Sequence, residues 1–202
     1  MQALKTKSVP VNFSPLRRRY TLEEFWALPE REDHARYNLI GGYLFMVSPP
    51  NPPHGKLDAR MQKALNKFLF DKNIDGDVHH PPEPIYRRAE DSTYLEPDMM
   101  YVSIELGNRM GAKRTADIVF EYLSRSTAVY DRTTKADTYL LLGVRELWLV
   151  DPVTETVEVR HSSKVDDTPV WEICTYSRGE HAKSRVLEGW EVSVDELFID
   201  LR

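Results

Sequence analysis

The segment DIVFEYLS, residues 117–124, constrains the fold of this chain more than any other part of its sequence. Alternate residues of a β-strand point to opposite faces of the sheet. Ile118, Phe120 and Tyr122 therefore share one apolar face, and Glu121 lies on the other face between apolar neighbours. Apolar residues on both faces are typical of a strand that is covered on both sides. The segment therefore predicts a central, buried strand.

Glu121 is the first candidate site residue, because a carboxylate inside such a strand is costly to desolvate. A proton, a basic partner or a metal ion can offset this cost. Buried ionisable groups with such partners are concentrated at functional sites. The alternative is an edge strand on which Glu121 is exposed to solvent.

Asp98 directly precedes the apolar segment 99–104, which we expect to be a strand. Taken alone, an aspartate at this position is a turn or cap residue. If the strands that carry Asp98 and Glu121 are neighbours, the two carboxylates converge on one cation. Ligands of this kind suit Mg²⁺ or Mn²⁺.

Lys135 lies on a predicted helix, 131–142, and shares a helix face with Tyr139 and Leu142. If that face packs on the sheet, Lys135 points inward and can stabilise negative charge on a phosphate. A surface lysine with its apolar stem packed against the protein explains the same spacing.

Two other positions carry histidines. His54 lies just before a predicted helix, 56–70, whose N-terminus favours an anion such as phosphate, although a solvated loop histidine is the simpler interpretation. His79 and His80 are adjacent and would point to opposite faces of a strand, so they do not form a metal pair and are interpreted as structural.

The remaining segments alternate between helical and extended patterns. Thr21 and Glu24 have the spacing of a capping box, Gly41-Gly42 indicates a hairpin turn, and Gly143 suits a helix C-terminus. We expect a short helix that ends at Pro29, a polar loop over 105–116, a C-terminal helix over 194–198, and strands over 36–47, 78–88, 146–151, 156–161 and 170–176. This order predicts an α/β or α+β domain with a mixed central β-sheet flanked by helices.

The length of 202 residues suits one domain, which we place at 20–202 after a basic N-terminal arm, 1–19, that carries three consecutive arginines. The net charge of -5 disfavours a strongly cationic sheath around nucleic acid but allows a local basic patch. Cys174 is the single cysteine, so no internal disulfide forms and a reducing compartment is favoured. Without a signal peptide or an apolar run long enough to span a bilayer, we expect a cytoplasmic protein with no membrane contact.

Four segments occur in an order that resembles a known family: YNLIGGYLFMVSPPNPPHG, EPDMMYV, DIVFEYLSRSTAVYDRTTKADTYLLLGVRELWLVDP and LEGWEVSVDELF. The family is that of putative restriction endonucleases with the PD-(D/E)XK nuclease fold. The resemblance extends from Tyr20 to Phe198 and is most specific between Asp117 and Pro152. It implies a restriction-endonuclease-like mixed sheet and a nuclease site that uses Mg²⁺ or Mn²⁺.

The resemblance also implies roles for individual residues. Pro97-Asp98 and Glu121 match the acidic elements of the motif, while Leu123 replaces its usual lysine and Lys135 is the position that could supply the missing cation. The implied catalytic residues are Asp98, Glu121 and Lys135, with Asp98 and Glu121 as metal ligands. Supporting roles fall to Asn38, His54, Asp117, Ser124 and Asp131, and phosphate contacts to Arg114, Arg125 and Arg132.

One departure concerns the early hairpin, where the family usually reads YELIDGE. Asn38, Gly41 and Tyr43 stand at its three acidic positions, which should weaken cation affinity, although Asn38 still offers a carbonyl oxygen. The first hypothesis is a Mg²⁺-dependent DNA endonuclease that hydrolyses phosphodiester bonds as a homodimer. The alternative is a catalytically weakened or inactive nuclease-fold protein that binds nucleic acid or protein. A third is a metal-independent structural domain whose apolar strands pair across a dimer.

Overall fold

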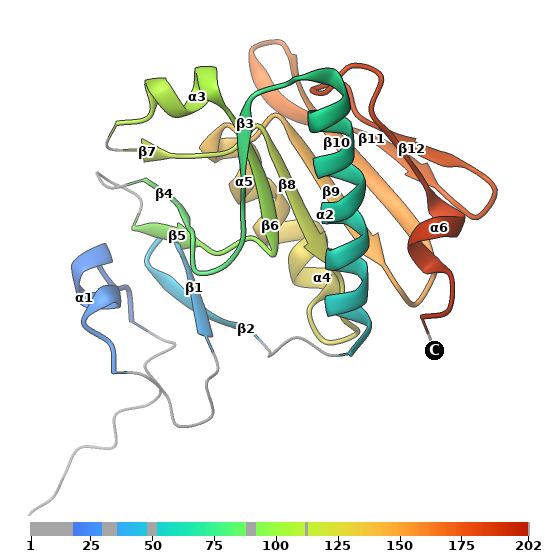
Figure 1. The fold of residues 1–202 in the computed structure, drawn as a ribbon. Coiled ribbons are helices and arrows are strands. Elements are labelled where there is room, and N and C mark those ends of the chain that lie inside the picture. The colour runs from blue at the N-terminus through green and yellow to red at the C-terminus, as the bar shows by residue number, and fades with distance from the viewer. Residues whose placement is uncertain (1–17, 30–35, 48–51, 88–91, 112, 202) are drawn as a thin grey trace, which may run out of the picture.

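The computed structural model of the chain describes residues 18–29, 36–47, 52–87, 92–111 and 113–201 (Figure 1). Of the predicted basic arm, residues 1–17 lie outside the described residues. No helix within the described ranges is long and apolar enough to cross a membrane.

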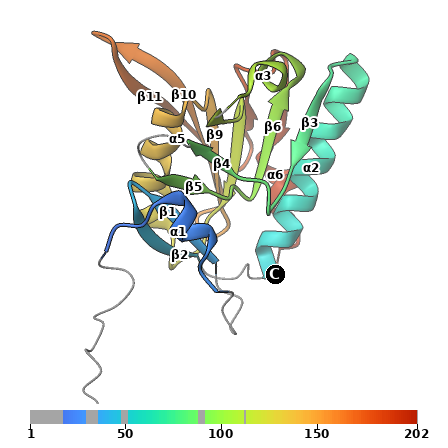
Figure 2. The same ribbon diagram turned by 90° about the vertical axis from the view of Figure 1, so that its left-hand side faces the viewer.

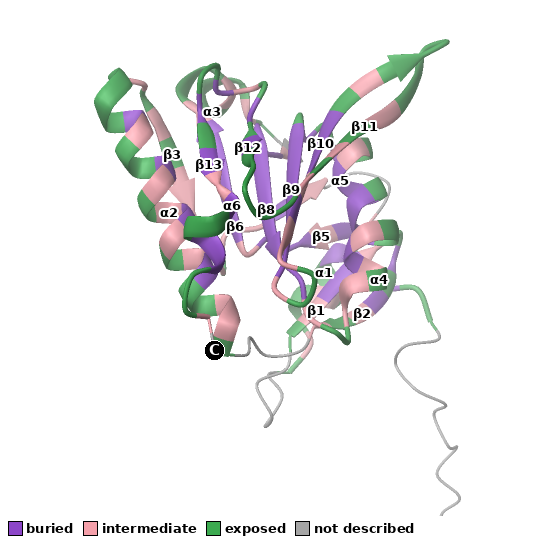
Figure 3. Cartoon of the chain, turned by 90° about the vertical axis from the view of Figure 1, so that its right-hand side faces the viewer, coloured by how far each residue is buried: buried purple, intermediate pink, exposed green. Residues whose placement is uncertain are grey.

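A six-stranded sheet with the strand order β11-β10-β9-β8-β6-β3 forms the centre of the fold. Its strands are β3 (Gly76–His79), β6 (Met99–Ser103), β8 (Ile118–Tyr122), β9 (Glu146–Asp151), β10 (Thr156–Val165) and β11 (Thr168–Tyr176). β8 and β9 are parallel and the other pairs are antiparallel, so the predicted mixed sheet is confirmed. All five residues of β8 are buried, as Figure 3 shows. The interpretation of Glu121 as an exposed residue of an edge strand is therefore wrong.

Helices cover both faces of this sheet (Figure 1). On one face lie α2 (Pro52–Lys72) and α6 (Val194–Phe198), and Phe120 of β8 belongs to the core beneath them. On the other face, α4 (Ala128–Tyr130), η2 (Asp131–Lys135) and α5 (Ala136–Leu142) follow one another, and Val119 packs in the core with Tyr139. The two-sided apolar character of the strand thus reflects two separate cores.

A second, five-stranded sheet with the order β2-β1-β5-β4-β7 lies beside the first, with α1 (Leu22–Trp26) close to it (Figure 2). Its antiparallel strands are β1 (Arg36–Ile40), β2 (Tyr43–Val47), β4 (Ile85–Arg87), β5 (Thr93–Leu95) and β7 (Lys113–Arg114). The predicted capping box at Thr21 is confirmed. The predicted hairpin is also confirmed, and its turn needs glycine because Gly41 and Gly42 have positive φ angles of 56° and 84°.

Several predicted boundaries are wrong. α2 begins at Pro52, because proline is compatible with the first turn of a helix. Part of the predicted loop 105–116 is the helix α3 (Ile104–Arg109), whose N-terminus is capped by the Ser103 side chain accepting from the Leu106 N–H. The hairpin of β12 (His181–Lys183) and β13 (Glu191–Ser193) was not predicted, since its strands are only three residues long.

Candidate active site

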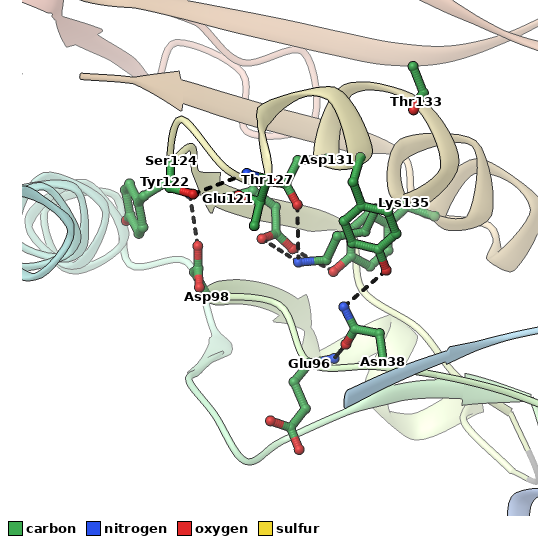
Figure 4. Close-up of polar contacts among 12 residues, drawn as sticks. Asn38, Glu96, Asp98, Glu121, Tyr122, Ser124, Thr127, Asp131, Thr133 and Lys135 are labelled. Atoms are coloured by element: carbon green, nitrogen blue, oxygen red, sulfur yellow. Dashed lines mark hydrogen bonds and ion pairs between the residues drawn. The ribbon is translucent and has the colours of Figure 1, made fainter. Parts of the chain in front are cut away.

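A cleft of about 570 Å³ opens at the C-terminal end of β8, between the first turns of α2, the residues before β6, strand β1 and η2. Seven residues predicted from the sequence line it: Asn38, His54, Asp98, Glu121, Ser124, Asp131 and Lys135. Figure 4 shows most of them pointing toward one another. Polar lining residues that the sequence analysis missed include Asp58, His80, Glu96, Thr127 and Tyr130.

Asp98 reaches the cleft through the pairing of β6 with β8. The antiparallel register aligns Met99 with Phe120, so that Asp98, one residue before β6, lies across from Glu121. Its Oδ2 accepts a hydrogen bond from the Tyr122 N–H at 2.8 Å, and its Oδ1 lies 3.0 Å from His54 Nε2. Burial by itself would raise the pKa of Asp98, but the His54 contact and the Lys135 charge hold it below its usual range.

Glu121 and Lys135 form a buried pair, each with 3% of its surface exposed. Lys135 Nζ donates to Glu121 Oε2 at 2.6 Å (Figure 4). The Tyr139 hydroxyl donates to Glu121 Oε1 at 2.6 Å. Burial raises the pKa of Glu121, although the Lys135 charge opposes the shift. Burial would lower the pKa of Lys135, but the surrounding carboxylates raise it, so the ammonium stays charged. The interpretation of Lys135 as a surface lysine is therefore wrong.

Asp131 joins this pair from η2, which is a π-helical turn. Its Oδ1 lies 3.8 Å from Lys135 Nζ, and burial raises its pKa despite the lysine charge. The Thr133 hydroxyl in the same turn donates to the Val129 carbonyl, a bond that competes with regular α-helical pairing. π-Turns within helices are frequent at functional sites. No sequence pattern predicted this turn.

The α2 side of the cleft carries His54 and Asp58, one turn apart on the same helix face. Burial would lower the pKa of His54, but its hydrogen bond to Asp98 raises it above its usual range. His80 Nδ1 lies 3.5 Å from Asp58 Oδ2. The spacing of four residues between His54 and Asp58 was the available sequence signal for Asp58. His80 was interpreted as structural, and the structure places it at the cleft.

Asn38 lies on β1 at the position where the resembled family pattern has a glutamate, and 1% of its surface is exposed. Its Nδ2 donates to the Tyr130 hydroxyl at 3.2 Å, and its Oδ1 accepts from the Glu96 N–H at 3.3 Å (Figure 4). The carbonyl oxygen expected to serve a cation is thus engaged by the backbone. Ser124, also in the cleft, accepts from the Thr127 N–H at 3.2 Å and so supports the start of α4.

Asp117 lies at the opposite end of β8 from Glu121, outside the cleft. Its Oδ1 is 2.9 Å from an Arg145 nitrogen, and its Oδ2 accepts from the Ser103 N–H at 2.8 Å. The structure therefore does not bring Asp117 together with the predicted site residues in the cleft. The physical reason is the extended strand, in which each residue advances the chain by about 3.3 Å.

The three arginines expected to contact phosphate do not line the cleft. Arg114 pairs with Glu83 at 2.7 Å, and Arg132 pairs with Asp151 at 2.8 Å. Both are paired with carboxylates that do not line the cleft, so the structure does not bring them to it. Arg125 is exposed and directly follows Ser124, which lines the cleft.

The sequence model of the Uma2 family, described as "Putative restriction endonuclease", matches residues 22–195. The chain belongs to this family. The chain is similar to the crystal structure of a "putative nuclease belonging to DUF820" from Anabaena variabilis, with a TM-score of 0.71 and 19% sequence identity. The superposition covers 91% of this chain and 99% of that chain. This likeness shows a shared fold, and the predicted resemblance is confirmed. No curated protein matches the chain.

Restriction-endonuclease-like families such as Uma2 generally use divalent metals, so we tested whether the cleft residues suit such an ion. The carboxylates of Asp98 and Glu121 are the hard oxygen donors that Mg²⁺ prefers, and with Asp131 they carry more negative charge than Lys135 balances. Both oxygens of Glu121 already accept hydrogen bonds, but each keeps a second lone pair. Within the described ranges, no group of three or more His, Cys, Asp or Glu side chains is arranged to hold a metal. The donors therefore suit a divalent cation in chemistry and charge, and Asp98 and Glu121 are the two that would hold it.

Proposed function

We propose that this chain is a divalent-cation-dependent endonuclease that hydrolyses phosphodiester bonds in DNA. The observation that carries the proposal is the convergence of Asp98, Glu121 and Lys135 in one cleft, from β8, η2 and the residue before β6. Membership of a family described as restriction endonucleases supports a nuclease function in general.

Asp98 and Glu121 would hold Mg²⁺ or Mn²⁺, which when bound supplies Lewis-acid activation of water and neutralises phosphate charge. His54 holds Asp98 Oδ1, and the Tyr122 N–H holds Oδ2, so this carboxylate is fixed in orientation. Lys135 would supply the positive charge that stabilises negative charge on the phosphate. Arg125, which is exposed and follows Ser124, would contact a backbone phosphate.

The acidic lining of the cleft predicts that DNA binding depends on the cation. Asp58, Glu96, Asp98, Glu121 and Asp131 all line it, and the chain as a whole has a net charge of -5. Phosphates are repelled from such a surface unless an ion of opposite charge is present. Gel-shift assays should therefore show weaker DNA binding in EDTA than in the presence of a divalent cation.

Cleavage of plasmid DNA in Mg²⁺ or Mn²⁺ tests the site directly. The wild type should nick or linearise the plasmid, while Asp98→Asn and Glu121→Gln, which keep side-chain shape but remove charge, should not. Asp71→Asn is a matched control, because Asp71 is an exposed acid on α2 outside this cleft. Equal cleavage by all four proteins would remove the site assignment.

We also propose that the active form is a homodimer, because a duplex presents two strands and a symmetric dimer presents two equal sites. Light scattering after size-exclusion chromatography, with and without duplex DNA, measures the mass. A monomer under both conditions would contradict this part of the proposal.

A second candidate function is that of a catalytically weakened or inactive nuclease-fold protein that binds nucleic acid or protein. Two features favour it: Asn38 stands where the resembled family pattern usually has an acid, and the Glu121 carboxylate is already paired with an ammonium ion. Calorimetry with Mn²⁺ separates the candidates. A folded wild-type protein that binds no Mn²⁺ but still retards DNA in a gel would favour the binding module.

A further inference from the structure

The ammonium group of Lys135 lies among carboxylates at the place where the proposed function requires a divalent cation. Its Nζ is 2.6 Å from Glu121 Oε2 and 3.8 Å from Asp131 Oδ1. All three side chains are buried, with exposed fractions of 4% for Lys135, 4% for Glu121 and 8% for Asp131. The lysine thus has one close carboxylate partner and one more distant partner.

Asp131 is placed to receive the lysine if the closer contact breaks. The distance of 3.8 Å exceeds that of a hydrogen bond, and both residues belong to the π-turn η2. A lysine side chain has several rotatable bonds and three donor hydrogens, so a small movement of Nζ closes this gap. The movement would free Glu121 Oε2 and keep the buried ammonium paired.

We propose that Lys135 is the resident cation of the metal-free site, and that a divalent cation binds by exchange, as the ammonium moves from Glu121 to Asp131. The proposal rests on the cation dependence of the proposed function. Two positive charges that share one carboxylate repel each other, whereas the exchange leaves neither buried ion unpaired. Cation affinity is then set by competition with Lys135, and Asp131 is a positioning residue that accepts the lysine.

Calorimetric titration of the cation-free protein with Mn²⁺ tests the exchange through four proteins: wild type, Lys135→Met, Asp131→Asn and the double variant. Lys135→Met should bind Mn²⁺ about tenfold more tightly than wild type, because the competing charge is gone. Asp131→Asn should bind more weakly, because the lysine then has no second partner. Lys63→Met, at an exposed lysine of α2, is the matched control and should bind as wild type does.

The double variant separates an acceptor of the lysine from a direct ligand of the metal. If Asp131 acts only through Lys135, then Asp131→Asn has little effect once Lys135 is methionine. If Asp131→Asn weakens binding equally in both backgrounds, its role as acceptor is overturned. Equal or weaker Mn²⁺ binding by Lys135→Met overturns the exchange itself.

A second measurement uses the wild-type protein and does not depend on the folding of these variants. In lysine-labelled protein, the NMR signal of the buried Lys135 side chain, identified by its absence from Lys135→Arg, should shift when Mg²⁺ saturates the site. An unchanged signal at saturation overturns the exchange. If neither the wild type nor Lys135→Met binds Mn²⁺, the proposed function fails together with the exchange. If the wild type binds Mn²⁺ tightly and Lys135→Met binds it no more tightly, only the exchange is overturned.

Discussion

Glu146, the first residue of β9, is fully buried and joins three parts of the fold through one carboxylate. Its Oε1 accepts from Trp148 Nε1 at 2.6 Å, and its Oε2 accepts from the backbone N–H groups of Arg185 and Val186 at 2.8 and 3.2 Å. His161 Nδ1 on β10 lies 3.1 Å from the same Oε2. The carboxylate therefore fastens the segment after β12 to the central sheet.

We expect Glu146→Ala to lower the free energy of unfolding by about 3–5 kcal/mol. Trp148 is fully buried, so its indole N–H is left without an acceptor, at a cost of about 1–3 kcal/mol. Arg185 and Val186 lose hydrogen bonds to a charged group, but they lie nearer the surface, where water replaces part of the loss. Glu146→Gln keeps one carbonyl oxygen and the side-chain shape, and should cost only about 1–2 kcal/mol.

Urea unfolding followed by tryptophan fluorescence and circular dichroism measures these differences, provided that the m-values agree between variants. A double-mutant cycle with Trp148→Phe isolates the indole contact, because phenylalanine keeps an aromatic ring but removes the donor. The cycle should give an interaction energy of about 1–3 kcal/mol. Glu188→Ala, at an exposed acid of the same segment, is the control and should stay within about 0.5 kcal/mol of wild type.

Two results would refute this reasoning. One is a loss below about 1 kcal/mol for Glu146→Ala, which would mean that water or a rearranged side chain satisfies the buried donors. The other is an equal loss with tryptophan and with phenylalanine at position 148, which would mean that the indole bond contributes nothing.

Three further predictions concern stability and are measured by the same unfolding assay. In cation-free protein, Lys135→Met should lower the free energy of unfolding by about 3–5 kcal/mol, because it leaves buried carboxylates without their close positive charge. Adding Glu121→Gln to this variant should recover most of the lost stability. Burial holds the pKa of His161 below its usual value of 6.5, so the unfolded state binds more protons than the folded state below that pH. The wild-type protein should therefore lose stability as the pH falls from 7 to 5, and His161→Asn should lose less stability over the same range. Gly76→Ala should lower the free energy of unfolding by about 1–3 kcal/mol, because a Cβ atom at this position would lie 2.6 Å from the Tyr101 ring.

Each of these has an outcome that contradicts it. If the Lys135→Met and Glu121→Gln losses simply add, the two residues do not act as a pair. Parallel stability curves for wild type and His161→Asn between pH 5 and 7 would rule out the histidine as their cause. Gly55→Ala is the control for Gly76→Ala, because Gly55 lies in α2 with open space at its Cβ position; a gain of about 0.5–1 kcal/mol is expected there.

The sequence alone was sufficient where the determining residues are close neighbours in the chain. The alternation in DIVFEYLS predicted a covered strand, and with it a buried Glu121. The Thr21 capping box and the Gly41-Gly42 turn likewise depend on groups within a few residues of one another. For the site, this reasoning supplied the candidate carboxylates and Lys135, and the family resemblance supplied their expected roles.

Only the tertiary structure decided which of these groups meet. The register of β6 on β8 brings Asp98 across from Glu121, while Asp117 of the same segment lies at the far end of the strand. The π-turn directs Lys135 onto Glu121, and Arg132 instead pairs with Asp151. Strand register and helix docking depend on contacts between residues far apart in the chain, whose energies compete across the whole fold, so no local pattern contains them.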